Sequence, residues 1–146
     1  MAKQKKWKEK YEVLSELGEG GNAKVYQVRL KESEETYALK ELQTGGREKK
    51  GRFVDEINII IENSEEIEGI IPIIDSSIDE YWYTMPIAKP IVQFIIEEKL
   101  TIRDIVDGSI QLCSTLEKLH EKGVSHRDIK PSNIYYYEGR FCLGDF

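Results

Sequence analysis

Short apolar runs separated by turn-forming residues dominate the first part of the chain, and this pattern predicts β-strands. The five expected strands cover residues 11–17, 25–30, 36–41, 70–74 and 81–85. Pro72 favours an edge position for the fourth strand. Between the third and fourth strands, the polar, glycine-containing segment 43–51 predicts a loop, and residues 52–61 predict an amphipathic helix. The apolar face of that helix holds Phe53, Ile57, Ile60 and Ile61.

The later part of the chain has apolar residues at helical spacing. Pro90 can begin a short helix that runs to about Glu97. Thr101 begins a longer helix, with Asp104 three residues on as a partial capping box and Gly123 as the C′ residue. The expected buried stripe of the long helix holds Ile102, Ile105, Val106, Ile110, Cys113, Leu116 and Leu119.

Two further strands, 134–137 and 141–143, form a hairpin around the turn 138–140. A group of antiparallel strands followed by helices is typical of an α+β fold. The 146 residues are enough for a compact domain with its own core.

Composition narrows the classes of protein that fit. Hydrophobic residues make up 40% and charged residues 33%, with a formal net charge of −6, so a general nucleic-acid binder is excluded. Cys113 and Cys142 lie far apart in apolar patterns, which predicts reduced, buried thiols in a cytoplasmic protein. No apolar run is long enough to span a bilayer, and no signal peptide is recognisable.

The first ten residues are rich in lysine, so we expect residues 1–10 to form a basic, solvated tail. Trp7 and Tyr11 could pin the end of that tail to the folded body.

Residues 125–134 read Ser-His-Arg-Asp-Ile-Lys-Pro-Ser-Asn-Ile and carry the strongest chemical signal in the chain. Asp128 can accept a proton from a hydroxyl, Lys130 can neutralise a phosphate, and Asn133 can hold Mg²⁺ through its amide oxygen. Pro131 stiffens the backbone between them. The alternative is a surface turn with local hydrogen bonds. The stretch resembles the catalytic loop of eukaryotic-type (Hanks-type) serine/threonine protein kinases, H-R-D-x-K-P-x-N.

The resemblance implies a role for each residue of this loop. Asp128 would accept the proton of the substrate hydroxyl, Lys130 would steady the γ-phosphate, and Asn133 would bind Mg²⁺. His126 corresponds to a structural member of the loop. Arg127 corresponds to a residue that commonly meets a phosphate on the activation segment.

Asp145 and Phe146 resemble the first two residues of the kinase D-F-G motif. Asp145 would then be the second Mg²⁺ ligand. Phe146 would pack under the helix at 52–61, against Ile60 and His126. The D-F-G glycine, the activation segment and the later helices of the family lie outside this sequence. We therefore expect an exposed apolar patch and self-association.

The segment 17–25 reads Leu-Gly-Glu-Gly-Gly-Asn-Ala-Lys-Val between two expected strands. Glycines there can let backbone amides approach phosphate oxygens, although such turns are also common in ordinary hairpins. The segment resembles the kinase glycine-rich loop G-x-G-x-x-G-x-V, with Ala23 at the third glycine position. The resemblance implies that ATP is held by Leu17, Gly18, Glu19, Gly20, Gly21, Asn22, Ala23, Lys24 and Val25.

Ala38-Leu39-Lys40 resembles the V-A-I-K strand of the family. Ala38 would pack on adenine and Lys40 would reach the α- and β-phosphates, whereas the plainer alternative for this lysine is a solvated edge charge. Glu56 resembles the helix αC glutamate that pairs with this lysine. Asp55 and Glu62 compete for that role, and the F-x-x-E-I pattern selects Glu56.

The stretch 81–88 resembles the family's last small-lobe strand and the hinge, although by composition alone it is ordinary core. Met85 would be the gatekeeper, and the backbones of Pro86 and Ala88 would bind the adenine edge. Tyr135 could form the floor of the adenine pocket.

The resemblance implies a complete kinase N-lobe and hinge at 11–88, made of a five-stranded antiparallel sheet plus helix αC, and a partial C-lobe at 89–146. The implied function is ATP- and Mg²⁺-dependent phosphorylation of protein serine or threonine. A non-catalytic nucleotide-binding or interaction module is the alternative. A small-molecule phosphotransferase is a third possibility, against which the pair Lys130-Pro131 argues.

Overall fold

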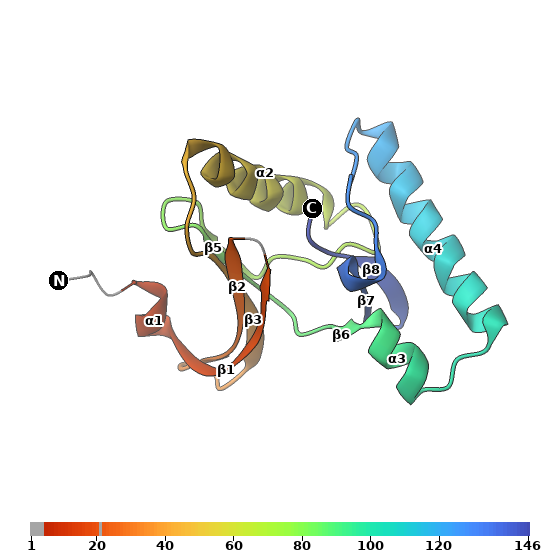
Figure 1. Ribbon diagram of the computed structural model, residues 1–146, viewed down its shortest axis with the longest axis horizontal. Helices are drawn as coiled ribbons and strands as arrows, with labels where there is room; N and C mark the ends of the chain where they lie inside the picture. The colour runs from red at the N-terminus through yellow and green to blue at the C-terminus, as the bar shows by residue number, and fades with distance from the viewer. Residues whose placement is uncertain (1–4, 21) are drawn as a thin grey trace. The chain divides into compact units, whose positions relative to one another are not determined.

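The computed structural model describes residues 5–20 and 22–146, which fold into two compact units. The first unit comprises Met1–Ile57 and Ile73–Ile87, and the second comprises Asn58–Pro72 and Ala88–Phe146. Figure 1 labels the helices and strands of both. Within the described ranges, no helix combines the length and apolar character needed to cross a membrane.

A five-stranded antiparallel sheet forms the first unit, in the order β1-β2-β3-β5-β4. The strands are β1 Tyr11–Gly20, β2 Ala23–Leu30, β3 Thr36–Leu42, β4 Asp75–Ser77 and β5 Trp82–Met85. The register of β1 against β2 slips between Val13 and Ser15. A bulge shifts the side-chain alternation by one residue, which explains why the apolar residues Val13 and Leu14 are adjacent.

The prediction of a strand at 70–74 is wrong. Ile70 forms a parallel bridge with Leu143, and the Ile71 amide donates to the Leu143 carbonyl at 3.1 Å, all within the second unit. Ile70 and Ile71 are both buried, so these apolar residues gain more by packing there than at a sheet edge. The polar segment Asp75–Ser77 forms the edge strand β4 instead.

Helix α2 spans Arg47–Asn63 and begins five residues before the expected start, so the loop predicted at 43–51 is only partly a loop. An ion pair between Glu48 and Arg52, one turn apart, supports the added turn. Phe53, Ile57 and Ile60 are buried as expected, whereas Ile61 is exposed.

The lysine-rich segment ends in a short helix, α1, at Trp7–Lys10, in which Trp7 is buried while Lys8, Glu9 and Lys10 are exposed as expected for a solvated segment. Trp7 and Tyr11 are buried with Leu39 and Trp82 in one apolar cluster of the first unit, which confirms that they anchor the segment. The Trp7 indole N–H donates to the buried carboxylate of Glu41 on β3. This hydrogen bond satisfies a polar group at each end.

The second unit contains α3 Ile91–Glu97, α4 Ile102–Glu121 and the 3₁₀ helix η1 Pro131–Asn133. Its sheet has the order β6-β7-β8, formed by Lys89–Pro90, Ile134–Tyr137 and Arg140–Leu143, so the expected hairpin has a third strand. Figure 1 shows these elements in green and blue.

Both predicted caps of α4 are confirmed. Thr101 and Asp104 exchange two hydrogen bonds of 2.9 and 3.2 Å and complete the capping box. Gly123 has φ +76°, and the amides of Gly123 and Val124 donate to the carbonyls of His120 and Leu119 at 2.9 Å. This is a Schellman motif, in which glycine avoids the strain of positive φ.

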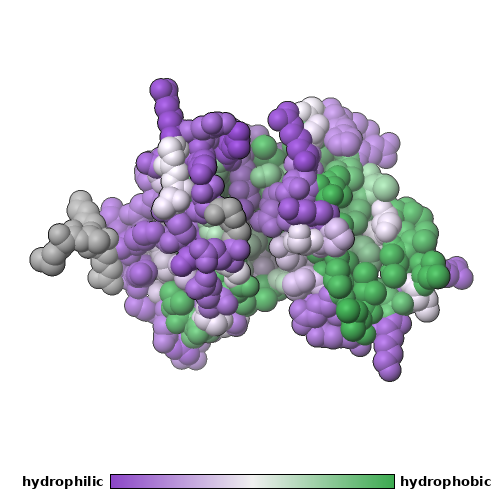
Figure 2. Space-filling view, viewed as in Figure 1, coloured by the Kyte–Doolittle hydropathy of each residue, from purple (hydrophilic) through white to green (hydrophobic). Residues whose placement is uncertain are grey.

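The buried stripe predicted for α4 is largely wrong. The buried residues are Gly108, Leu112, Thr115 and Leu119. A Cβ at Gly108 would lie 2.4 Å from the Phe141 ring, so the absent side chain lets β8 pack closely against this face. Ile102 is 82% exposed, and Val106, Ile110 and Cys113 are exposed as well. The prediction that both cysteines are buried is therefore confirmed for Cys142 and wrong for Cys113. Figure 2 shows a hydrophobic surface over α3 and α4.

Candidate active site

Lys40 on β3 and Glu56 on α2 form an ion pair inside the first unit. The Lys40 Nζ lies 2.9 Å from Oε1 and 3.2 Å from Oε2 of Glu56. The two side chains are only 14% and 7% exposed, so the interaction is weakly screened by water. The structure thus brings together the two residues that the F-x-x-E-I and A-L-K patterns select.

Tyr83 on β5 is a third member of this cluster, and sequence reasoning missed it. Its hydroxyl donates to Oε1 of Glu56 at 2.7 Å, and its ring centroid lies 5.8 Å from the Lys40 Nζ. The register of β3 against β5 places Tyr83 directly opposite Lys40. The signal in the sequence was an aromatic residue on the strand expected beside β3. Tyr83 holds one carboxylate oxygen while Lys40 binds both.

The glycine-containing segment is a tight hairpin between β1 and β2. Gly18 pairs with Val25, Glu19 with Lys24, and Gly20 with Ala23; Gly21 lies outside the described residues. Leu17 is half exposed, and a Cβ on Gly18 would meet no atom within 4 Å. An open backbone strand of this kind can be approached by a ligand.

Asn22 ties the tip of the hairpin to the segment that follows β3. Its side-chain oxygen accepts from Lys49 Nζ at 2.8 Å, and its carbonyl accepts from the Gln43 amide at 2.6 Å. These contacts link the hairpin to α2, the helix that carries Glu56. Among the expected adenine contacts, Val25 on β2 pairs directly with Lys40 on β3.

Ala38 is buried on β3 and pairs directly with Met85 on β5. Met85 packs against the cluster of Phe53, Ile57 and Tyr83. Pro86 and Ala88 lie in the irregular segment that follows β5.

His126 organises the candidate catalytic loop in the second unit. The Asp128 amide donates to the His126 Nδ1 at 3.2 Å, so Nδ1 is the acceptor nitrogen of the ring. Nε2 forms the other hydrogen bond of the ring, to the Gly144 carbonyl at 2.7 Å. The ring is buried, and its centroid lies 4.8 Å from that of Phe146. His126 therefore bridges the catalytic loop and Gly144, with both ring nitrogens hydrogen-bonded.

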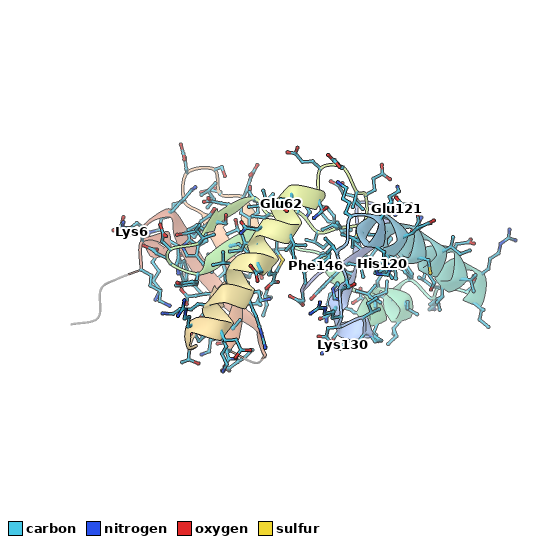
Figure 3. The ribbon with its side chains drawn as sticks, turned by 90° about the horizontal axis from the view of Figure 1, so that it is seen from above. Lys6, Glu62, His120, Glu121, Lys130 and Phe146 are labelled. Carbon is cyan, nitrogen blue, oxygen red and sulfur yellow. The ribbon has the colours of Figure 1, made fainter. Side chains whose placement is uncertain are left out.

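Asp128, Lys130 and Asn133 form a hydrogen-bonded group. The Asn133 Nδ2 donates to the Asp128 carbonyl at 2.8 Å and to its Oδ2 at 3.1 Å, and the Lys130 Nζ lies 3.3 Å from the same oxygen. The hydrogen bond from Lys130, and to a lesser degree that from Asn133, lowers the pKa of the Asp128 carboxyl below its ordinary value. Figure 3 draws these side chains, with Lys130 labelled.

Backbone geometry presents this group at the surface. Arg127 has φ +69°, a left-handed conformation that is uncommon for a residue with a side chain. The chain therefore turns sharply between buried His126 and exposed Asp128. Strained backbone of this kind is concentrated at functional sites.

The β7–β8 hairpin brings Asn133 next to Gly144, the residue that precedes Asp145. Ile134 pairs with Leu143, and the Gly144 amide donates to the Asn133 carbonyl at 3.0 Å. The Tyr135 hydroxyl donates to the Asp145 Oδ2 at 3.3 Å, a contact that sequence reasoning missed. Burial, followed by the nearby Asp145 charge, raises the pKa of Tyr135. Tyr135 therefore stays protonated as a donor at neutral pH.

The residues at this end of the hairpin fit a magnesium ion chemically. Asn133 uses its amide nitrogen for both hydrogen bonds to Asp128, which leaves the acceptor role to its amide oxygen. An amide oxygen and the Asp145 carboxylate are the oxygen donors that Mg²⁺ prefers.

Known proteins resemble this chain along nearly its whole length. A family model described as "Protein kinase domain" matches residues 11–146. The serine/threonine-protein kinase PknD of Chlamydia trachomatis is 30% identical over 145 residues, which cover 86% of this chain and 15% of that protein. The serine/threonine-protein kinase MPS1 of Encephalitozoon cuniculi is 30% identical over 139 residues, covering 92% of this chain and 23% of the relative.

A probable casein kinase I homolog of Encephalitozoon cuniculi is 29% identical over 142 residues, covering 93% of this chain and 44% of that protein. The chain thus spans less than half of each of these relatives. The five-stranded antiparallel sheet with α2 matches the small N-lobe of the family, and the second unit contains part of its helical C-lobe. The chain belongs to the protein kinase domain family.

Proposed function

We propose that this chain carries the nucleotide-side machinery of a serine/threonine protein kinase, which transfers the γ-phosphoryl group of ATP to a protein hydroxyl. The observation that carries the proposal is the group of Asp128, Lys130 and Asn133, joined by hydrogen bonds at one carboxylate. An ionised acid beside a cation and an amide is the combination that phosphoryl transfer requires. The names of the relatives, serine/threonine-protein kinases, support the same activity.

Lys40 is proposed to bind the phosphates of ATP. Glu56 and Tyr83 hold its ammonium group in place, so its charge is presented in a fixed position at low cost in entropy. The hairpin 17–25 would cover the phosphates with its backbone amides.

The adenine contacts follow from the strands beside the ion pair. Val25 and Ala38 would pack on the ring, with Met85 behind it. The backbones of Pro86 and Ala88 would recognise its edge.

Asp128 is proposed to accept the proton of the substrate hydroxyl. Its lowered pKa keeps the carboxylate ionised at neutral pH, so it is already in the accepting form. Lys130 would neutralise charge on the transferred phosphoryl group. Asn133 and Asp145 would hold Mg²⁺, which when bound supplies charge neutralisation of the phosphates.

The test is phosphoryl transfer from radiolabelled ATP to a generic protein substrate, with Asp128→Asn as the diagnostic variant. Transfer by the chain that falls at least about 100-fold in Asp128→Asn is expected, because general-base catalysis contributes about that much. The matched control is Asp107→Asn, an exposed acid on α4. Nucleotide binding without transfer would favour the alternative, a non-catalytic nucleotide-binding module. Equal transfer by Asp128→Asn and the control would refute the role of Asp128.

A further inference from the structure

The segment 144–146, which follows β8, holds Asp145 in a strained backbone conformation. Asp145 has φ +53°, in the left-handed region that a residue with a side chain seldom adopts. Such a conformation persists only where the surrounding structure holds it. Hydrogen bonds hold the preceding residue: the Gly144 amide donates to the Asn133 carbonyl at 3.0 Å, and the Gly144 carbonyl lies 2.7 Å from the His126 Nε2. These contacts fix the backbone that leads to Asp145, but they do not orient its carboxylate.

Tyr135 on β7 contacts both Gly144 and Asp145 with one side chain. Its hydroxyl donates to the Asp145 Oδ2 at 3.3 Å. Its ring lies over Gly144, since a Cβ on that residue would be 2.9 Å from the Tyr135 Cε2 and 3.3 Å from its Cδ2. Both distances are shorter than an ordinary contact between carbon atoms, so the ring comes this close only because residue 144 is glycine. The ring therefore covers the backbone of the segment while the hydroxyl holds its carboxylate.

The orientation of a carboxylate matters most to a metal ion with strict geometry. An aspartate side chain rotates about two bonds, so its oxygens can take several positions on a fixed backbone. Mg²⁺ requires near-ideal octahedral geometry with oxygens at about 2.0–2.1 Å, whereas Ca²⁺ accepts more oxygens at longer distances in flexible arrangements. Loss of a fixed orientation therefore lowers Mg²⁺ affinity more than Ca²⁺ affinity.

The other proposed metal ligand, Asn133, is held in a comparable way. It is buried, and its amide nitrogen donates to the Asp128 carbonyl at 2.8 Å and to the Asp128 Oδ2 at 3.1 Å. Partners that hold a metal ligand in this manner typically contribute about 10- to 100-fold in metal affinity. Tyr135 stands in the same relation to Asp145 as Asp128 does to Asn133.

We propose that Tyr135 is a positioning residue that holds the Asp145 carboxylate in the orientation Mg²⁺ needs, and that it thereby favours Mg²⁺ over Ca²⁺. The inference rests on the proposed function, because it takes Asp145 as a metal ligand. It goes further by assigning metal selectivity to a side chain that is not itself a ligand. Tyr136 is the matched comparison on the same strand, since its ring stacks on Phe94 with the centroids 3.7 Å apart.

The first test needs neither metal nor nucleotide. NMR couplings between the Hα and Hβ protons of Asp145 report the rotamer populations of its side chain. Tyr135→Phe keeps the ring and removes only the hydroxyl, so it should fold and should redistribute these populations, whereas Tyr136→Phe should not. Unchanged populations in Tyr135→Phe would overturn the proposal, and this outcome does not depend on whether the chain binds ATP.

The second test measures metal selectivity by calorimetric titration of the whole chain with ATP, in Mg²⁺ and separately in Ca²⁺. In Mg²⁺, Tyr135→Phe should bind about tenfold more weakly than the unchanged chain. In Ca²⁺ the loss should be less than about threefold, because Ca²⁺ tolerates a mobile ligand. Gly144→Ala should act in the same direction, because its Cβ displaces the ring. Tyr136→Phe should match the unchanged chain in both metals.

The contrary outcomes separate this inference from the function on which it rests. Equal losses for Tyr135→Phe in the two metals would mean that Tyr135 supports the fold or the nucleotide, and would overturn its role in selectivity. Binding that Tyr135→Phe leaves unchanged in Mg²⁺ would overturn the role of Tyr135 alone. Absence of ATP binding by the unchanged chain in both metals would overturn the proposed nucleotide site together with this inference.

Discussion

Lys40, Glu56 and Tyr83 show how three side chains from three elements make one fixed charge arrangement. The ammonium of Lys40 contacts both oxygens of the buried Glu56 carboxylate, and the phenol of Tyr83 donates a further hydrogen bond to one of them. Such a pair is costly to break on one side, because the partner is left as an uncompensated buried charge.

Tyr83→Phe should lower the free energy of unfolding by about 1.5–3 kcal/mol, the range for a hydrogen bond to a charged group. Urea denaturation followed by fluorescence measures this. Tyr81→Phe is the control, since Tyr81 is in the same segment and its hydroxyl has no role in the ion pair. Equal stability of the two variants would show that the Tyr83 hydroxyl contributes nothing to the site.

The ionisation of Asp128 gives a pH prediction with a defined sign. Its pKa is lowered in the folded state, so the stabilisation from its hydrogen bonds is present above the ordinary pKa of about 3.9 and is lost as the pH falls through the folded value. Lys130→Ala removes the main cause and should raise the pKa toward the ordinary value. Carboxyl carbon NMR shifts titrated against pH report it directly. An unchanged pKa in Lys130→Ala would mean that Asn133 alone sets the ionisation.

Helices and strands were predictable from the sequence where the local pattern and the packing agree. The capping box at Thr101 and the C′ glycine Gly123 are purely local signals, and both are confirmed. The segment 70–74 and the buried face of α4 were wrong, because their packing depends on Leu143 and Phe141, which are distant in the sequence. The spacing of hydrophobic residues alone predicted a wide buried stripe on α4. Because β8 approaches the helix closely, only a narrow stripe of it is buried.

Gly108→Ala tests that close approach. The added Cβ would lie 2.4 Å from the Phe141 ring, so we expect a loss of about 1–3 kcal/mol in the free energy of unfolding. Gly51→Ala on α2 is the matched control, because no atom lies within 4 Å of its Cβ. It should stabilise the chain by up to about 1 kcal/mol through helix propensity. Thermal or urea unfolding compares the two, and a stabilising Gly108→Ala would contradict the packing described.

The molecule as a whole combines an acidic surface with an exposed apolar face on its helices. Val92 and Ile96 on α3, with Ile102, Val106 and Ile110 on α4, are all exposed. Exposed apolar surface on a helix pair marks an interaction site or favours aggregation. We infer that the 146-residue chain self-associates through this face.

Sedimentation velocity over a range of concentrations measures this association. The chain should form dimers or larger species, and the double variant Val106→Lys, Ile110→Lys should shift it toward monomer. Glu117→Lys with Glu121→Lys is a control at two exposed acidic positions of α4. A monodisperse monomer at all concentrations would contradict the inference.

In the candidate site, the sequence was enough to predict that residues of one motif come together. It was less informative about contacts between residues of different motifs. Asp128, Lys130 and Asn133 lie within six positions, so their assembly follows from a local loop. The hydrogen bond from Tyr83 to Glu56 and the one from Tyr135 to Asp145 depend on how the strands are paired. No short motif specifies that register.

Calorimetric titration of the chain with ATP and Mg²⁺, beside Asp145→Ala, tests the proposed nucleotide site most directly. We predict saturable binding that is lost or weakened at least about tenfold in Asp145→Ala, because the proposed metal site loses its carboxylate. Tyr137→Phe, on the same hairpin, should bind as the unchanged chain does. No heat of binding by the folded chain, or equal binding by Asp145→Ala, would contradict the assignment of these residues to ATP and Mg²⁺.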